Sequence, residues 1–301
     1  MENVYHIPAM LTETIEGLAI KSEGVYVDVT LGGGGHSREI LKHLNKNGKL
    51  YSLDQDLEAI SRQQDVPENW QIIHSNFRYL ANFMDYYGVK QIDGVLADLG
   101  VSFHHFDEAE RGFSFRFDGP LDMRMNRQGG QTAADIVNNY SEDALARVLH
   151  LYGELPNAKQ LARRIQAARP IATTWDLLRA LTGSTSVDID PRKKKEVTCA
   201  FQALRIDVND ELGALRDMLV AAKELLRPSG RIVVLTYHSL EDRIVKNFLR
   251  SGNLEGIIEK DFYGNILAPF RLIEKGRTAT EEEIERNPRA RSAKLRVAEK
   301  I

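Results

Sequence analysis

A run of four glycines separates an apolar segment from a helical one near the start of the chain. The apolar segment is residues 25–29, the glycines are residues 32–35, and residues 37–44 repeat apolar side chains at helical spacing. Glycine adopts positive φ at little cost and lets a ligand approach the backbone closely. A strand, a glycine turn and a helix N-terminus in this order are typical of a nucleotide-type cofactor site in an α/β fold.

The segments that follow alternate between strand and helix patterns. Residues 94–99 are almost wholly apolar, as in a strand that is buried on both faces of a sheet. The alternation predicts a mostly parallel sheet with helices on both sides. We expect strands at residues 25–29, 50–53, 71–74, 94–99 and 231–236. A last strand at 293–298 competes with a solvated tail.

The alternation stops in the middle of the chain. No strand pattern occurs between residue 107 and residue 231, whereas helix patterns cover 133–151, 158–168 and 174–181. We therefore expect a helical domain at residues 107–206, inserted into an α/β domain of residues 1–106 and 207–301. Asn209 is expected to cap the helix with which the α/β domain resumes.

Composition excludes several classes of protein. The net charge of −3 gives no overall signature of nucleic-acid binding, so contacts with a polyanion require local patches. The single cysteine, Cys199, excludes an internal disulfide framework and suits a reducing compartment. The chain has no signal-peptide pattern at residue 1 and no apolar run of membrane-spanning length. We expect a cytoplasmic protein with no membrane partner.

Acidic residues around the glycine turn indicate which cofactor binds there. Asp54 ends the second predicted strand, where an acidic residue accepts hydrogen bonds from ribose hydroxyls. Asp28 precedes the turn and would disfavour an anionic pyrophosphate but favour a cationic ligand. His36 and Ser37 occupy the place of the third glycine of a dinucleotide motif. The pattern favours S-adenosylmethionine, which is cationic, over a nicotinamide cofactor.

Two further candidates follow later strands. Phe77 comes after the third predicted strand, where an aromatic ring could hold an adenine or simply pack in the core. Asp98 ends the fourth, and strand carboxyl ends point toward the ligand in such sheets. Asp98 could face the methyl donor, take a proton from an amine acceptor, or cap backbone amides.

Longer motifs resemble those of a known family. The chain is similar to the bacterial ribosomal RNA small-subunit methyltransferase H (MraW) family from about residue 6 to residue 298. The similarity rests on an ordered set of motifs: HIPAML at 6–11, DVTLGGGGHS at 28–37, DLGVS at 98–102, ERGFSF at 110–115, PLDMRM at 120–125, FQALRI at 201–206, HSLEDRIVK at 238–246 and NPRARS at 287–292.

This resemblance implies a class I methyltransferase fold with a helical insertion. The implied activity is methylation of the exocyclic N4 amine of a cytidine in 16S rRNA, in the decoding region of the small ribosomal subunit. By position, the family's S-adenosylmethionine contacts fall on Gly34, Gly35, His36, Asp54, Phe77, Asp98 and His105. The family usually has glutamine where this chain has His105. Asp98 is also the candidate for the catalytic acceptor.

The RNA side is less specific. Phe113, Phe115 and Phe117 could stack on a flipped base or form a packing cluster. Arginines at 111, 116, 124 and 127, and the basic run 192–195, could contact phosphates. His104, His105 and His238 lack the spacing of a metal site, so we expect no metal.

Other functions stay open at this level. A catalytically weak RNA-binding assembly factor would keep the same fold, and His105 and the unusual stretch 197–200 keep that alternative open. A methyltransferase that acts on a different acceptor is another, and the oligomeric state is not set by the sequence.

Overall fold

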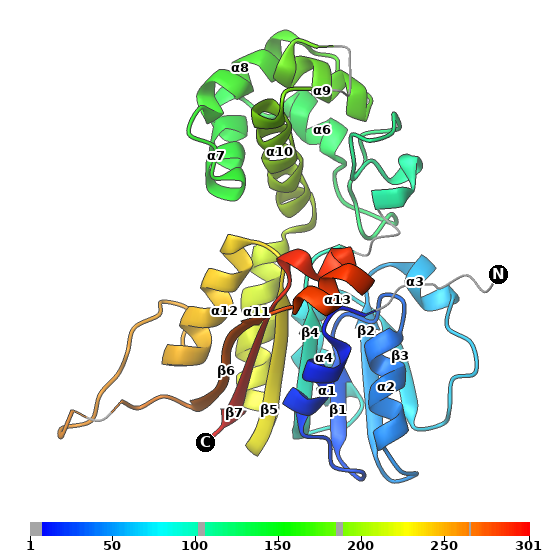
Figure 1. The fold of residues 1–301 in the computed structure, drawn as a ribbon, viewed down its shortest axis with the longest axis vertical. Coiled ribbons are helices and arrows are strands. Elements are labelled where there is room, and N and C mark those ends of the chain that lie inside the picture. Colours follow the sequence, from blue (N-terminus) through cyan, green and yellow to red (C-terminus); the bar gives the residue numbers. More distant parts are fainter. Residues whose placement is uncertain (1–7, 102–105, 185–188, 265) are drawn as a thin grey trace. The chain divides into compact units, whose positions relative to one another are not determined.

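The computed structural model describes residues 8–101, 106–184, 189–264 and 266–301 (Figure 1). The chain divides into two compact units. Unit 1 comprises Met1–Gly100 and Leu212–Ile301, and unit 2 comprises Val101–Glu211.

Unit 1 is built on a seven-stranded sheet with the order β3-β2-β1-β4-β5-β7-β6. Neighbours from β3 to β5 pair in parallel, whereas β7 pairs antiparallel with both β5 and β6. The Rossmann-like, mostly parallel sheet predicted from the sequence is therefore confirmed. The strands are β1 (Val25–Asp28), β2 (Lys49–Asp54), β3 (Trp70–His74), β4 (Ile92–Asp98), β5 (Leu226–Thr236), β6 (Phe270–Thr278) and β7 (Lys294–Lys300).

Helices cover both faces of this sheet (Figure 1). Successive strand residues point to opposite faces, so Val95 packs in one core and Leu96 in the other. The first core includes residues of α4, α11 and α12, and the second includes residues of α1, α2 and the η3 turn. The helical elements are α1 (Leu11–Leu18), α2 (Gly35–His43), α3 (Leu57–Ser61), η1 (Phe77–Tyr79), α4 (Leu80–Tyr86), α11 (Glu211–Leu225), α12 (Ser239–Ser251), α13 (Glu281–Arg286) and η3 (Pro288–Ser292).

Unit 2 is helical. Its elements are η2 (Ala109–Arg111), α6 (Ala133–Asn139), α7 (Glu142–Gly153), α8 (Ala158–Ala167), α9 (Thr174–Thr182) and α10 (Pro191–Asn209). Apolar side chains of these helices form one buried core with the loop residues Phe113, Leu121 and Met123. Side-chain caps from Thr132, Ser141 and Thr173 start α6, α7 and α9.

The structure departs from the sequence prediction at several helices and strands. The helix pattern over 133–151 is two helices, because the hydroxyl of Ser141 accepts from the backbone N–H of Ala144 (3.2 Å) and starts a new one. The expectation that Asn209 caps a helix is wrong, because it is the last residue of α10 and left-handed Asp210 follows it. Strand β6 was not predicted, since it is an edge strand rich in charged residues. The segment 294–300 is a strand rather than a solvated tail.

The fold gathers the ends of its parallel strands at one edge. Strands β1, β2 and β4 end at Asp28, Asp54 and Asp98. Because these strands are parallel and adjacent, the three carboxylates lie along the same edge of the sheet. Among the described residues, no helix is both long and apolar enough to cross a membrane.

Candidate cofactor site

Asp28 fixes the glycine turn from inside the protein. Its carboxylate is fully buried and accepts hydrogen bonds from the hydroxyl of Ser37 (2.6 Å) and from the backbone N–H of Thr30 (3.1 Å). The turn is thereby tied to the first helical turn of α2. Because this carboxylate is buried, it cannot contact a ligand directly. Asp28 can favour a cationic ligand only through the electric field of its charge.

Burial raises the pKa of Asp28 from 3.8 to about 6, although the Ser37 hydroxyl and the nearby His36 lower it. Because the folded pKa lies above the unfolded one, the folded state holds the proton more tightly between about pH 4 and pH 6. The contribution of Asp28 to the free energy of unfolding is therefore fully present below about pH 4. This contribution is lost as pH rises through about 6.

We expect Asp28→Asn to reveal this effect. The free energy of unfolding of the variant minus that of the wild type is expected to rise by about 2–3 kcal/mol between pH 4 and pH 7. The difference rises because the wild type loses stability when the buried carboxyl ionises, whereas the amide of the variant does not ionise. Urea unfolding of both proteins at several pH values measures the difference, and a difference that does not change with pH would contradict the assignment.

Gly34 and Gly35 allow close packing around the turn. Gly34 precedes α2 with φ +79°, and a Cβ there would lie 2.4 Å from Oε1 of Gln63. A Cβ on Gly35 would lie 2.3 Å from Cγ of Pro8. Positive φ favours glycine at position 34, whereas the Pro8 ring leaves no room for a side chain at position 35.

Asp54 closes the turn from the neighbouring strand. Its carboxylate accepts from the backbone N–H groups of Gly32 (2.8 Å) and Asp56 (2.9 Å). A carboxylate accepts more than two hydrogen bonds, so the same group can also bind ribose hydroxyls. Asp54 thus has a structural role that the sequence did not indicate.

His36 is a buried, neutral link between three segments. Its Nε2 lies 3.2 Å from the carbonyl oxygen of Ala9, which can only accept, so Nε2 carries the proton. Its Nδ1 lies 3.6 Å from Oδ2 of Asp98. Burial lowers the pKa of His36 below 6.5, which favours the neutral ring. The side chain therefore anchors the segment before α1 beside the glycine turn.

Asp98 is held by two neighbours at the end of β4. Its backbone N–H donates to the hydroxyl of Thr30 (2.7 Å), and its Oδ1 accepts from the phenol of Tyr237 (2.7 Å). Tyr237 was missed by the sequence analysis. Its position directly after β5, at a strand carboxyl end next to β4, is the signal that could have identified it.

The other predicted contacts are Phe77 and His105. Phe77 begins η1 after Asn76, whose side chain accepts from the N–H of Arg78 (3.0 Å). Its ring packs partly buried against the sheet core, so a core role and a ligand role stay open. His105 lies outside the described residues.

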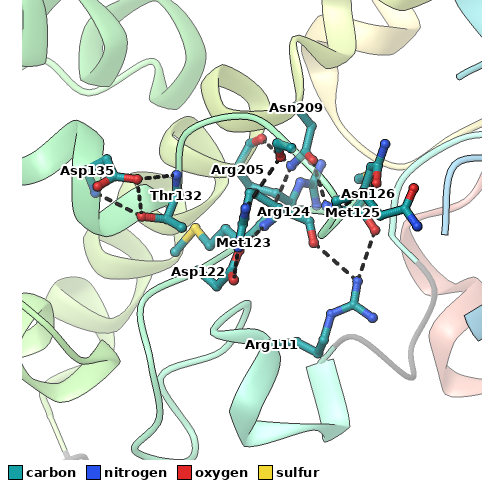
Figure 2. Close-up of polar contacts among 12 residues, drawn as sticks. Arg111, Asp122, Met123, Arg124, Met125, Asn126, Thr132, Asp135, Arg205 and Asn209 are labelled. Atoms are coloured by element: carbon teal, nitrogen blue, oxygen red, sulfur yellow. Dashed lines mark hydrogen bonds and ion pairs between the residues drawn. The ribbon is translucent and has the colours of Figure 1, made fainter. Parts of the chain in front are cut away.

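In unit 2, two of the four loop arginines predicted to contact RNA, Arg111 and Arg124, serve the fold (Figure 2). Arg111 is almost fully buried and donates from Nη2 to the carbonyls of Arg124 and Met125, both at 3.2 Å. Arg124 forms a two-bond pair with Asp122, which holds the pKa of that carboxyl below its usual value even though burial acts to raise it. Arg116 and Arg127 are exposed and remain the candidates of this loop for contact with phosphates.

Helix α10 holds the same loop in place. The side-chain amide of Asn209 donates to the carbonyl of Met123 (2.8 Å), and its oxygen accepts from the N–H of Met125 (2.8 Å) (Figure 2). Asn209, which we expected to cap a helix, instead fixes the loop 122–126 by backbone bonds. Such a loop presents a defined surface rather than a flexible one.

The aromatic residues of this loop differ in exposure. Phe113 is buried, and Phe115 packs edge-on against Phe201 with ring centroids 5.4 Å apart. The packing interpretation holds for these two rings. Phe117 is 48% exposed and is the one of the three left for a base to stack on.

Comparison with known proteins decides the family. The model of the MraW methylase family matches residues 3–301, almost the whole chain. The chain belongs to the MraW methylase family. The resemblance inferred from the motifs is therefore confirmed, and with it an S-adenosylmethionine-dependent methyltransferase activity.

Curated relatives of this MraW-family chain share its length. A protein of Parabacteroides distasonis named "Ribosomal RNA small subunit methyltransferase H" is 57% identical and covers 100% of this chain and 99% of its own. A protein of the same name from Bacteroides thetaiotaomicron is 53% identical over 99% of this chain and 98% of its own. A solved structure of a putative rRNA-methylase from Clostridium thermocellum is 14% identical, covers 98% of this chain and 100% of its own, and aligns with a TM-score of 0.45.

Proposed function

We propose that this MraW-family protein transfers a methyl group from S-adenosylmethionine to the exocyclic N4 amine of a cytidine in 16S rRNA. The substrate is the decoding region of the small ribosomal subunit, and the reaction takes place in the cytoplasm. Membership in the MraW family carries the enzyme class and the donor. The names of the curated relatives support the small-subunit substrate.

The carboxylates at the strand ends support the binding of S-adenosylmethionine at this edge of the sheet. Asp54 ends β2 and Asp98 ends β4, on either side of the glycine turn after β1. A sulfonium and an ammonium are stabilised by nearby negative charge, whereas a pyrophosphate is not. In the order β3, β2, β1, β4, Phe77 would meet the adenine, Asp54 the ribose, and Asp98 the cationic end.

Positioning provides most of the catalysis in this proposal. Displacement at a sulfonium methyl needs the attacking nitrogen in line with the breaking bond, and no covalent enzyme intermediate. The cytosine amine is a weak nucleophile because its lone pair is delocalised into the ring. A hydrogen bond from that amine to the Asp98 carboxylate localises the lone pair, and the same carboxylate can take the proton that leaves. The target base must leave its stack to reach this edge.

Unit 2 would serve recognition of the rRNA. Its helix α10 begins at Pro191, and the next four residues, Arg192, Lys193, Lys194 and Lys195, are all exposed. Positive charge at a helix N-terminus opposes the helix dipole, so this run costs rather than adds helix stability. A local feature that works against folding is expected where function requires it. Phosphates of a polyanionic substrate supply the compensating charge.

We expect replacement of Lys193, Lys194 and Lys195 by alanine to weaken rRNA binding about tenfold or more. Loss of phosphate contacts also lowers the salt dependence of binding, by roughly 0.7–0.9 in slope for each contact. S-adenosylmethionine binding should not change. A filter-binding titration of small-subunit rRNA at several salt concentrations measures both effects.

A matched control removes the same charge from unit 1. Lys46, Lys49 and Lys90 are exposed and lie at the amino ends of strands, opposite the proposed donor edge. Their alanine variant should bind rRNA like the wild type. Equal losses in the two triple variants would mean that net charge alone acts, and would contradict a site on α10.

Methyl transfer from labelled S-adenosylmethionine tests the proposed substrate. Small subunits, large subunits and protein-free 16S rRNA, each from cells that lack the modification, serve as acceptors. We expect label in 16S rRNA of the small subunit and none in the large subunit. Donor binding by calorimetry without label in any RNA would favour a catalytically weak assembly factor, and label only in another acceptor would overturn the substrate.

A further inference from the structure

The phenol of Tyr237 is placed to control the carboxylate at the reacting edge. Tyr237 comes directly after β5, and β5 pairs with β4 through Leu235 and Asp98. Its hydroxyl donates to Oδ1 of Asp98 at 2.7 Å. This hydrogen bond links Tyr237 directly to the carboxylate at the strand ends.

The tyrosine itself is held on two sides. Its backbone N–H donates to Oε2 of Glu241 at 2.9 Å, at the start of α12. Its ring is partly buried and packs against the apolar cluster that includes Met10, Leu31 and Leu235. The hydroxyl is therefore fixed before any ligand arrives.

The phenol remains a donor at every physiological pH. Burial, together with the negative charges of Asp98 and Glu241, raises the pKa of Tyr237 well above 10. A protonated phenol beside a carboxylate can only donate to it. One oxygen of Asp98 is thus oriented by the protein, and the other faces His36 at 3.6 Å, a neutral ring whose Nδ1 carries a lone pair.

We propose that Tyr237 is a positioning residue that orients the Asp98 carboxylate toward the cationic amino-acid end of the methyl donor. This inference rests on the proposed function, because it takes Asp98 as the group that meets that end. Tyr237 does not touch the donor in this account. It fixes the rotamer of the carboxylate that does, so that donor binding does not have to order it.

Calorimetric titration of Tyr237→Phe tests the proposal. The variant keeps the ring in its apolar cluster and removes only the hydroxyl. We expect its affinity for S-adenosylmethionine to fall about tenfold, the effect of one hydrogen bond to a charged group. Methylthioadenosine keeps the adenosine and the sulfur but lacks the cationic amino-acid part. Its affinity should stay within about twofold of the wild-type value.

Two controls separate positioning from general damage. In an Asp98→Ala background, adding Tyr237→Phe should change donor affinity by less than about twofold, because the group to be oriented is gone. Tyr26→Phe removes another 2.7 Å hydrogen bond, from the N–H of Lys21, at the amino end of β1, and should bind the donor normally.

Each other outcome has a definite meaning. Equal losses for S-adenosylmethionine and methylthioadenosine, a full loss in the Asp98→Ala background, or no loss at all would overturn the role of Tyr237. Failure of the wild-type protein to bind S-adenosylmethionine would instead overturn the proposed function. The two failures are therefore distinguishable in the same set of titrations.

Discussion

Replacement of Asp98 by asparagine is expected to lower the rate of methyl transfer at saturating donor and rRNA by about 100-fold or more. The amide has the same shape, and its oxygen can still accept from Tyr237 at the position of Oδ1. It carries no negative charge for the donor, however, and it cannot take the proton that the cytosine amine loses. Loss of a general base typically costs a factor of about 10²–10⁴ in rate.

Single-turnover rates and rRNA affinity, measured on the same preparation, check this expectation. Affinity for rRNA should equal that of the wild type. Asp217→Asn is a matched control, because Asp217 is an exposed carboxylate of unit 1 that pairs with Arg78 at 3.3 Å. A rate for Asp98→Asn within a few-fold of the control would show that a different group accepts the proton.

The second large effect is expected at the glycine turn. Gly34→Ala should weaken S-adenosylmethionine binding about 100-fold, because the new Cβ stands on the turn and meets Oε1 of Gln63 at 2.4 Å. Gln63 also contacts the carbonyl of Gly32 (3.5 Å), so its displacement disturbs the turn further. Alanine at φ +79° adds a strain of about 1–2 kcal/mol.

Gly88→Ala separates strain from loss of the site. Gly88 has φ +68°, and nothing lies within 4 Å of its added Cβ. Both variants carry the same left-handed backbone strain and should lose free energy of unfolding through it, whereas only Gly34→Ala displaces Gln63 and should lose donor binding. Calorimetry and urea unfolding of the two variants measure these quantities. Equal donor affinity in both variants would exclude the turn as the binding surface.

Much of the fold was predictable because its signals are local. The segment 94–99 is almost wholly apolar, which indicates a buried strand. The four glycines indicate the turn between β1 and α2. Strand β6 was missed because an edge strand can carry charged residues along its length, and Arg271, Glu274 and Arg277 gave no alternation. Helix α10 was missed because its first turns hold a basic run.

The candidate site shows the same limit. Strand ends gave Asp54 and Asp98, because parallel strands bring their last residues to one edge. The partners of these residues come from distant parts of the chain. Tyr237 lies 139 positions from Asp98, and Asp54 meets Gly32 across 22 positions. No spacing rule links such pairs, so the sequence identified the ligand-facing groups but not the hydrogen bonds that orient them.

The identity of the methylated nucleoside tests the central claim most directly. Small subunits that lack the modification are incubated with the protein and labelled S-adenosylmethionine, and the 16S rRNA is then digested to nucleosides and separated. The label is expected in N4-methylcytidine, in a fragment from the decoding region. Label in any other nucleoside, or no label in 16S rRNA, would contradict the proposed function.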